Sequence, residues 1–397
     1  NRIFILMRYI ICFLLLASTC FGQKVQSFDV IVYGATPSGV MAAYAAKAAG
    51  KKTLLIDAAT TLPYAQQGFG MKFDLNPAQI HGLPRDFFRK VGGKLGKFQA
   101  FEFESSMGYE VLQAYLDDAK IVVWPGHQVI ASLVEGNEVK QLSLQAEEGV
   151  KLVKAKSYID CSYNGDMLLK TGYQATKELE EDGMGGSTTR LIYAEPTWAN
   201  LQAPVLIAGK GVDVINMQLG QSAAIKAVES ILRDIPVAKI SSEEVERYYK
   251  YNPWMDGSRP DLIVDDAEAA NMEIIGHWNK IKNQPGTFGG TYLQTNPLDD
   301  LGSRIRFTSK TPLKGDYQLY YYIPAVRGGT TVINLEVYVA KVRHVASVRI
   351  APNTTETWVP VGTYHFEDNT TGDVLVSQRG ANGLLVADAI LWLPKNK

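Results

Sequence analysis

Residues 28–57 read FDVIVYGATPSGVMAAYAAKAAGKKTLLID, and this stretch decides the fold of the N-terminal half of the chain. The apolar run at residues 28–33 is typical of a strand that is buried on both faces of a parallel sheet. Gly34 and Gly39 then flank a sharp turn, and a helix rich in alanine follows. Gly50 stands where a glycine commonly ends a helix. The stretch therefore predicts a strand, a tight turn and a helix that packs closely on the sheet.

A second apolar run, at residues 53–56, is followed directly by Asp57. An acid about 20 residues after the first glycine suits a carboxylate that holds the ribose of a nucleotide, with the pyrophosphate at the helix N-terminus. The usual second glycine of such a turn is replaced by Thr36, and Pro37 follows it. The alternative is a strand–helix–strand unit whose glycines serve only packing. The order of the elements favours a dinucleotide site.

The length and charge of the chain bound its class. At 397 residues we expect two or three domains with a substantial buried core. The 40 basic and 41 acidic residues give a net charge of −1 and form no long run of one sign. Nothing in this balance favours a nucleic acid as a partner.

Residues 1–23 are typical of a secretory signal, in which Met7 begins the leader and residues 1–6 lie upstream of it. A basic residue, a short apolar run and small residues follow in the expected order, and cleavage after Gly22 is the favoured site. The apolar run is too short for a stable membrane span. We expect a secreted or periplasmic protein; the alternative is an outer-membrane lipoprotein attached through Cys20.

Cysteine and histidine are sparse. Of three cysteines, only Cys161 lies outside the predicted signal, which excludes an internal disulfide and a cysteine-ligated iron–sulfur cluster. The five histidines show no spacing of metal ligands, so we expect no metal site. They are His81, His127, His277, His344 and His365.

Beyond Asp57 the pattern predicts an inserted set of antiparallel strands within the nucleotide-binding sheet. Residues 58–76 form an irregular stretch that suits a loop over a cofactor. The sequence predicts helices at residues 83–91 and 109–118, and alternating strands at 121–124, 128–135, 139–145 and 150–155. A strand at 158–160 returns to the parallel sheet. Gly165 and Asp166 follow its end, where ligands bind in open α/β sheets.

The middle of the chain carries weaker signals. Residues 179–196 are polar and rich in glycine, which predicts a loop or linker, and 204–208 suit an apolar strand. A helix is predicted at 219–233, opened by Gly220, Gln221 and Ser222. A further helix is predicted at 241–251, in which Ser241 and Glu244 form a capping box.

The composition shifts after residue 252, and the segment that follows predicts a separate domain. Residues 252–264 suit a linker between a first domain at 24–251 and a second at 265–397. Short alternating strands with glycine, proline and asparagine turns predict a β-sandwich. The predicted strands are 303–308, 316–323, 332–338, 345–350, 358–366, 373–377 and 384–392. The fold class is thus an α/β Rossmann-like domain with inserted antiparallel β hairpins, followed by an all-β sandwich domain.

Several motifs in a fixed order resemble the secreted FAD-dependent oxidoreductases of bacteria that are often labelled xanthan lyase-like. The motifs are GATPSG, LLID, GFGMKFD, IHGLPRDFFRKVGG, YIDCSYNGDMLLKTG and LGQSAA. The segments WVPVGTYHF and GDVLVSQRGANGLLVADAILWLP resemble the golvesin or xanthan-lyase carbohydrate-binding-like C-terminal domain. The resemblance covers nearly all of the chain after the signal.

The resemblance implies FAD as the cofactor. It places five turn residues against the FAD pyrophosphate: Gly34, Thr36, Pro37, Ser38 and Gly39. It places Asp57 on the adenosine ribose, and Gly165 with Asp166 in a second glycine element beside the cofactor. It places Gly220, Gln221 and Ser222 at the start of a helix whose dipole faces the flavin.

The chain departs from the family in its short substrate region between Asp166 and Gly220. Residues 206–217 also lack the histidine and arginine that the family carries near the flavin. We therefore name no catalytic residue; Lys210 and Asp213 are the nearest titratable side chains to the expected flavin face. Whether the protein is an enzyme stays open on the sequence alone.

Two functions follow from the sequence. The first is an exported FAD-dependent oxidoreductase that passes hydride between an organic or carbohydrate substrate and the flavin. The second is a catalytically degenerate flavin-domain protein that binds a carbohydrate or a cell-surface polymer through its sandwich. Trp278, Tyr292 and Trp358 are candidates to stack on sugar rings, with burial in the core as the alternative. Polysaccharide lyase activity is the least favoured.

Overall fold

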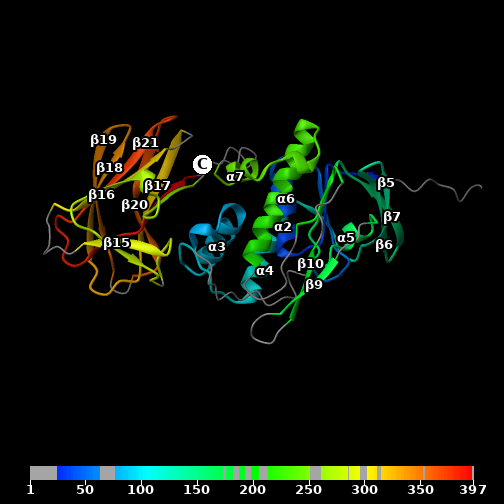
Figure 1. The fold of residues 1–397 in the computed structure, drawn as a ribbon, viewed down its shortest axis with the longest axis horizontal. Helices are drawn as coiled ribbons and strands as arrows, with labels where there is room; N and C mark the ends of the chain where they lie inside the picture. The colour runs from blue at the N-terminus through cyan, green and yellow to red at the C-terminus, as the bar shows by residue number, and fades with distance from the viewer. Residues whose placement is uncertain are drawn as a thin grey trace, which may run out of the picture.

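The computed structural model forms an α/β part followed by a β part (Figure 1). It describes residues 25–62, 77–172, 176–181, 187–192, 198–204, 213–250, 261–284, 286–295, 302–310, 314–351 and 354–395. The predicted signal and most of the predicted loop at 58–76 lie outside these residues.

A parallel five-stranded sheet organises the α/β part. Its order is β11 (Leu201–Gln202), β8 (Ser157–Asp160), β2 (Val30–Tyr33), β3 (Thr53–Ile56) and β4 (Val122–Trp124). The predicted first strand, second strand and returning strand are thereby confirmed. One assignment was wrong, because β4 does not belong to the antiparallel insertion. It pairs in parallel with β3 and forms the edge of this sheet.

Both faces of this sheet are covered, which explains the unbroken apolar run of its central strand. On one face Val30 and Val32 pack in a cluster with four helices. These are α2 (Pro37–Ala48), α3 (Gly82–Lys94), α4 (Ser105–Asp118) and α6 (Asp213–Arg233). On the other face Ile31 and Tyr33 pack against a second sheet. That sheet has the order β1 (Gln26–Ser27), β7 (Gly149–Lys154), β6 (Glu138–Ala146) and β5 (Gln128–Glu135).

The second sheet is the predicted antiparallel insertion. Strands β5, β6 and β7 pair antiparallel, and β1 extends them in parallel with β7. Inward residues of these strands, such as Val129 and Leu144, form one core with the parallel sheet. The α/β part therefore has three layers: helices, a parallel sheet and an antiparallel sheet.

The middle segment contains more regular structure than the sequence predicts. After α5 (Asp166–Leu169), strands β9 (Thr176–Glu181) and β10 (Ser187–Ile192) pair antiparallel as a hairpin. The prediction of a loop or linker over 179–196 was therefore wrong for these strands. Charged and polar side chains dominate both strands, which hides the alternation that signals a strand. The predicted strand at 204–208 lies outside the described residues from 205 onward.

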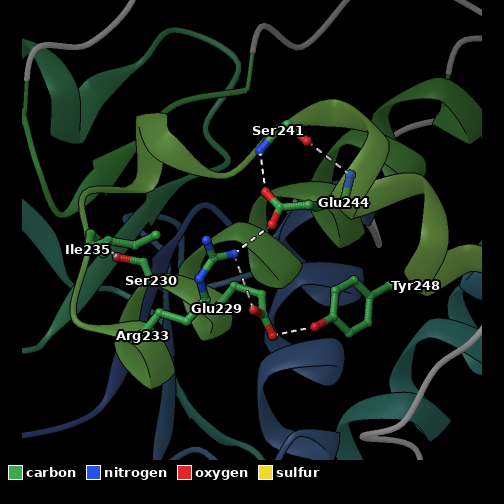
Figure 2. A network of polar contacts seen from close by, with 7 residues as sticks. All are labelled: Glu229, Ser230, Arg233, Ile235, Ser241, Glu244 and Tyr248. Carbon is green, nitrogen blue, oxygen red and sulfur yellow. Dashed lines mark hydrogen bonds and ion pairs between the residues drawn. The ribbon is translucent and has the colours of Figure 1, made fainter.

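The end of α6 is tied to α7 (Ser242–Lys250) by a polar network, which Figure 2 shows. The predicted capping box is confirmed: Ser241 N donates to Glu244 Oε2 at 2.8 Å, and Glu244 N donates to Ser241 Oγ at 3.2 Å. Arg233 joins this box at 2.7 Å, and the Tyr248 hydroxyl donates to Glu229. Within the described part of the chain, no helix is both long and apolar enough to cross a membrane.

The C-terminal part is a β-sandwich, as the sequence predicts. One sheet has the order β12 (Leu262–Asp265), β23 (Ala389–Pro394), β17 (Gly315–Ile323) and β20 (Thr357–Phe366). The other has the order β13 (Met272–Ile275), β16 (Arg304–Lys310), β21 (Thr371–Ser377), β18 (Val332–Val339) and β19 (Val342–Arg349). A smaller sheet joins β14 (Asn279–Lys282), β15 (Thr291–Thr295) and β22 (Leu385–Ala387). Inward residues of both large sheets, including Tyr317, Trp392, Phe307 and Val374, form one core. Short 3₁₀ turns lie at Pro77–Gln79, Val237–Lys239 and Ala269–Asn271.

The sandwich begins earlier than the sequence suggests and contacts the α/β part directly. Leu262 opens β12 and pairs with Trp392, whereas the sequence predicts a linker over residues 252–264. Next to it, Asp261 accepts from Arg85 at 3.1 Å and from Arg89 at 2.9 Å, both on α3. Phe98 follows α3 and packs against Tyr320 of β17, with ring centroids 4.7 Å apart.

We expect the change Asp261→Asn to destabilise the contact between the two parts by about 2 kcal/mol, because it leaves two guanidinium groups without their anion. Burial alone would raise the pKa of Asp261, but Arg89 and Arg85 hold that pKa well below its usual range. A carboxyl whose pKa is lower in the folded protein than in the unfolded chain stabilises the fold. This stabilisation is fully present above the pKa of the unfolded chain, about 4, and is lost as the pH falls below it. The free energy of unfolding, measured in urea, should therefore decrease below about pH 4, and this decrease should be smaller in the variant.

The matched control is Glu110→Gln, which breaks an exposed pair with Lys94. We expect it to change the free energy of unfolding by less than about 0.5 kcal/mol at any pH. Equal effects of the two substitutions would show that the Asp261 contact contributes no more than a surface ion pair.

Candidate functional site

The carboxyl ends of four parallel strands lie at one level, and this edge holds the predicted site residues. Tyr33 at the end of β2 pairs with Ile56 on one side and Asp160 on the other, and Ile56 pairs with Trp124. The chain passes from β2 to β3 on one side, whereas β8 lies on the other side of β2. The carboxyl ends of the paired strands β2 and β8 are therefore a topological switch point, outside which ligands bind in open α/β sheets.

The turn after β2 is closed so tightly that two of its positions need glycine. Gly34 has φ of 96°, and a Cβ there would lie 2.5 Å from Ser162 N in the loop after β8. A Cβ on Gly39 would overlap the carbonyl oxygen of Gly34. The backbone of Gly34 also donates to Ile56 O at 2.8 Å, which ties the turn to β3. The two glycines thus let three chain segments meet at one point.

The side chains of the turn bind protein groups. Thr36 is the N-cap of α2: its hydroxyl accepts from Gly39 N at 3.2 Å and donates to Cys161 O at 2.9 Å. Pro37 occupies the first turn, where its missing N–H costs nothing. Ser38 Oγ contacts Cys161 Sγ at 3.6 Å. These contacts lock the start of α2 onto the loop after β8.

The backbone amides at the start of α2 are the groups that suit an anion. The N–H groups of Thr36 and Ser38 make no hydrogen bond to any residue that the structure describes. The first turn of α2 contains no acidic side chain, so the helix itself supplies no anion at the positive end of its dipole. Unpaired amides at a helix N-terminus are the usual partners of a phosphate. The residues present therefore fit a pyrophosphate.

Asp57 ends β3 beside this turn and is only 5% exposed. Its carboxylate accepts from Ala35 N at 2.6 Å and from Ala59 N at 2.8 Å. Burial raises the pKa of Asp57, and these two amides offset part of that rise. Each carboxylate oxygen has a second lone pair, so the group can still accept from a ribose hydroxyl.

The loop after β8 lies on the other side of the switch point, next to the turn after β2. Gly165 adopts the left-handed conformation with φ of 65° and caps the short helix α5. Asp166 is an exposed residue that opens that helix, and partial desolvation of its carboxyl raises its pKa. The negative charge of Asp166 also contributes to the raised pKa of Asp57, after the larger effect of burial.

Asp160 ends β8 and Cys161 follows it, and the sequence analysis did not identify either residue as part of the site. Asp160 is buried, and it accepts from Ser162 Oγ at 2.6 Å and from Leu168 N at 2.8 Å. Burial raises the pKa of Asp160 to about 6 despite these hydrogen bonds. An acid that ends an apolar strand was the available signal. The thiol of Cys161 is fully buried and free, and its burial raises its pKa to about 12.

The predicted start of the last helix was wrong, because α6 begins at Asp213 instead of 219. Gly220 therefore lies well inside the helix, where a Cβ would overlap the carbonyl of Ser38. Gln221 accepts from Leu83 N at 2.8 Å, and the Ser222 hydroxyl donates to the helix backbone. These residues pack α6 against α2 and α3. Because they lie inside the helix, they do not form a helix N-terminus whose dipole could face the flavin.

The two titratable candidates near the expected flavin face are not tested by the described residues. Lys210 lies outside the described residues, and only the backbone of Asp213 is described, as the first residue of α6. No acid or base can be assigned from either. The substrate side of the site thus stays a prediction.

A separate cavity of about 470 Å³ lies in the sandwich. Its lining residues are Gln284, Tyr292, Gln294, Ala325, Val326, Arg327, Thr355 and Leu384. Sugar stacking was wrong for Trp358, which is 4% exposed and packs against Phe98, Phe288 and Tyr322. Tyr292 does line the cavity but is 5% exposed, so its ring offers no open face. Trp278 is partly buried against the sandwich core.

Comparison with known proteins assigns both parts. Residues 29–201 match the FAD dependent oxidoreductase family, and residues 262–392 match the Golvesin C-terminal domain. The protein therefore combines a domain of the FAD-dependent oxidoreductase family with a golvesin C-terminal domain. A xanthan lyase from Bacillus sp. (strain GL1) is 26% identical over 140 residues, which is 34% of this chain and 15% of that enzyme. The chain thus matches a small share of its curated relative.

Three solved structures illustrate the similarity to known folds, each at a low TM-score. A Paenibacillus xanthan lyase is 26% identical over 34% of this chain and 13% of its own, with a TM-score of 0.32. The OxyS anhydrotetracycline hydroxylase from Streptomyces rimosus is 12% identical over 57% of this chain and 66% of its own, with a TM-score of 0.40. A flavoprotein/dehydrogenase from Cytophaga hutchinsonii is 11% identical over 58% and 87%, also with a TM-score of 0.40.

We expect Gly34→Ala to destabilise the α/β part by at least about 3 kcal/mol, because strained backbone and a clash with fixed backbone atoms add. Gly93→Ala is the matched control, since a Cβ at this exposed helical position meets nothing within 4 Å. The control should be neutral or stabilise by about 0.5–1 kcal/mol. Thermal and urea unfolding measure both. A Gly34→Ala protein as stable as the control would contradict the tight closure of the turn.

Proposed function

We propose that the N-terminal domain binds FAD and that the protein is an exported oxidoreductase acting on an organic substrate. FAD, when bound, accepts or donates hydride. The observation that carries the proposal is that the amides of Thr36 and Ser38, beside Asp57 at the switch point of the parallel sheet, have no hydrogen bond to the described residues. The leader-like residues 1–23 support export.

Residues on both sides of the switch point have a role in this proposal. The amides of Thr36 and Ser38 bind the pyrophosphate, in a turn whose shape depends on Gly34, Pro37 and Gly39. Asp57 accepts from the adenosine ribose, and Gly165 with Asp166 borders the cofactor on the side of β8. Gly220, Gln221 and Ser222 act through packing, because they hold α6 against the start of α2.

We expect the change Asp57→Asn to weaken FAD binding by about 10- to 100-fold, because it removes a charge-assisted hydrogen bond to the ribose. FMN and riboflavin lack the adenosine ribose, so their affinities should not change. Flavin absorbance of the purified protein and fluorescence titration of the apoprotein measure the three affinities. Circular dichroism confirms that the variant is folded.

Asp118→Asn is the matched control, because it removes an exposed carboxylate at the end of α4. It should bind FAD as the unchanged protein does. Equal affinity of Asp57→Asn for FAD would remove Asp57 from the site. A folded unchanged protein that cannot be loaded with FAD would contradict the proposed function as a whole.

A second function is favoured by the sandwich cavity. We infer that this cavity binds a carbohydrate with acidic groups, because its wall combines the exposed cation Arg327 with the amides of Gln284 and Gln294. Amide side chains donate to and accept from sugar hydroxyls, and a guanidinium binds a carboxylate through two parallel hydrogen bonds. Recognition here depends on polar groups rather than on ring stacking.

We expect Arg327→Ala to reduce the affinity for an acidic polysaccharide, with xanthan as the probe, by about tenfold or more. Arg379→Ala removes an exposed arginine outside the cavity and should have no effect. Affinity electrophoresis in gels with xanthan or with a neutral glucan measures both. Retention that is equal for the two variants, or equal in the two polymers, would rule out the cavity as the binding site.

A further inference from the structure

Three aspartates meet inside the sandwich, at the end of its first strand. Asp265 ends β12, Asp266 follows it, and Asp388 lies between β22 and β23. One carboxylate oxygen from each of the three lies within 4.8 Å of the other two. The three residues are 6%, 2% and 0% exposed, in that order. The antiparallel pairing of Asp265 with Ala389 brings them together from opposite ends of the domain.

Two of the three carboxylates have their hydrogen bonds from the surrounding protein. Asp266 accepts from the Thr291 hydroxyl at 2.8 Å and pairs with Lys280 Nζ at 3.1 Å. Asp388 accepts from Phe288 N at 3.1 Å. These partners fix the orientation of both carboxylates. Among the described residues, Lys280 is the one cation that forms an ion pair with these three acids.

The third carboxylate has an oxygen with no partner. Asp265 Oδ1 accepts from Ala267 N at 2.9 Å, whereas Oδ2 is buried and makes no hydrogen bond to the described residues. A buried carboxylate oxygen is costly unless something pairs with it. A Cβ at Gly289 would overlap this carboxylate. Gly289 therefore leaves free the space next to Asp265 that any side chain would fill. The orphaned oxygen is an observation separate from the clustering, and it points to a missing positive partner.

We propose that Asp265, Asp266 and Asp388 bind one calcium ion. The ionised cluster with Lys280 carries two uncompensated negative charges, which a divalent cation neutralises. The donors are all oxygen, with no thiolate and no imidazole, which selects a hard cation over zinc. Carboxylates in an irregular arrangement suit Ca²⁺, whereas Mg²⁺ requires near-ideal octahedral geometry and keeps more of its water.

The position of the site gives the ion a structural role. It joins β12, which directly follows the Asp261 contact with α3, to β23 in the centre of the sandwich sheet. It also fixes Thr291, the residue before Tyr292 in the wall of the 470 Å³ cavity. The calcium site therefore holds together the beginning of the domain, its last strand and one side of the cavity.

The test uses the full chain, freed of metal with EGTA and titrated with CaCl₂ alone. We expect one Ca²⁺ per chain by isothermal titration calorimetry and a rise of several degrees in Tm at saturation. MgCl₂ at the same concentration should give a smaller rise. Asp265→Asn should lower the calcium affinity at least tenfold, yet match or exceed the unchanged protein in Tm in EGTA, because it removes a buried charge. Asp316→Asn, an exposed aspartate of the same domain, is the control and should change neither value.

The unchanged protein decides the proposal even if the Asp265 variant fails to fold. A Tm that is the same in EGTA and in CaCl₂, with no heat of binding, would overturn the proposal and leave protons and Lys280 as the partners of the cluster. Calcium binding that is equally tight in Asp265→Asn would also overturn it, since the ion would then lie elsewhere.

Discussion

The backbone of the turn after β2 lies so close to the backbone of the loop after β8 that no side chain fits between them. Gly34 meets Ser162 and Cys161 at this point, and Gly39 folds back on Gly34. Because this closure fixes the first turn of α2, it also fixes where the amides of the helix point. The helix cannot shift along the sheet without opening that contact. The rest of the α/β part, including the packing of α6 on the start of α2, builds on this position.

The polar groups at the carboxyl edge divide into those that bind other protein groups and those that the proposed cofactor would bind. Three side chains bind neighbouring protein groups: the hydroxyls of Thr36 and Ser38 and the carboxylate of Asp160. They position the turn after β2 and the loop after β8. Main-chain amides at the start of α2, with lone pairs on Asp57, are what remains. A site made from backbone donors tolerates changes of side chain. The hydroxyl of Thr36 binds Gly39 N and Cys161 O, so at the position of the usual second glycine its side chain caps α2.

Buried charge also organises the sandwich and its junction with the first domain. Asp261 joins the domains through two arginines of α3, and a few residues later Asp265 and Asp266 meet Asp388 in the interior. Aromatic rings complete the junction, where Trp358 packs beside Phe98 and is lost as a sugar-binding surface. One short segment, which opens the second domain, thus carries both the contact to the α/β part and the acidic cluster.

The sequence by itself determined the local elements and their order. The strand, glycine turn, helix and acid of residues 28–57, the antiparallel insertion and the sandwich follow from apolar periodicity and turn residues, which depend on neighbours in the chain. Tertiary structure alone decided contacts between distant segments: that β4 joins the parallel sheet, that β9 and β10 pair despite polar strands, that Gly220 serves helix packing, and that Trp358 is core. It also brought Asp388 to Asp265. Pairing across such distances leaves no periodic signal, because its energy comes from burial and charge compensation that exist only once the chain has folded.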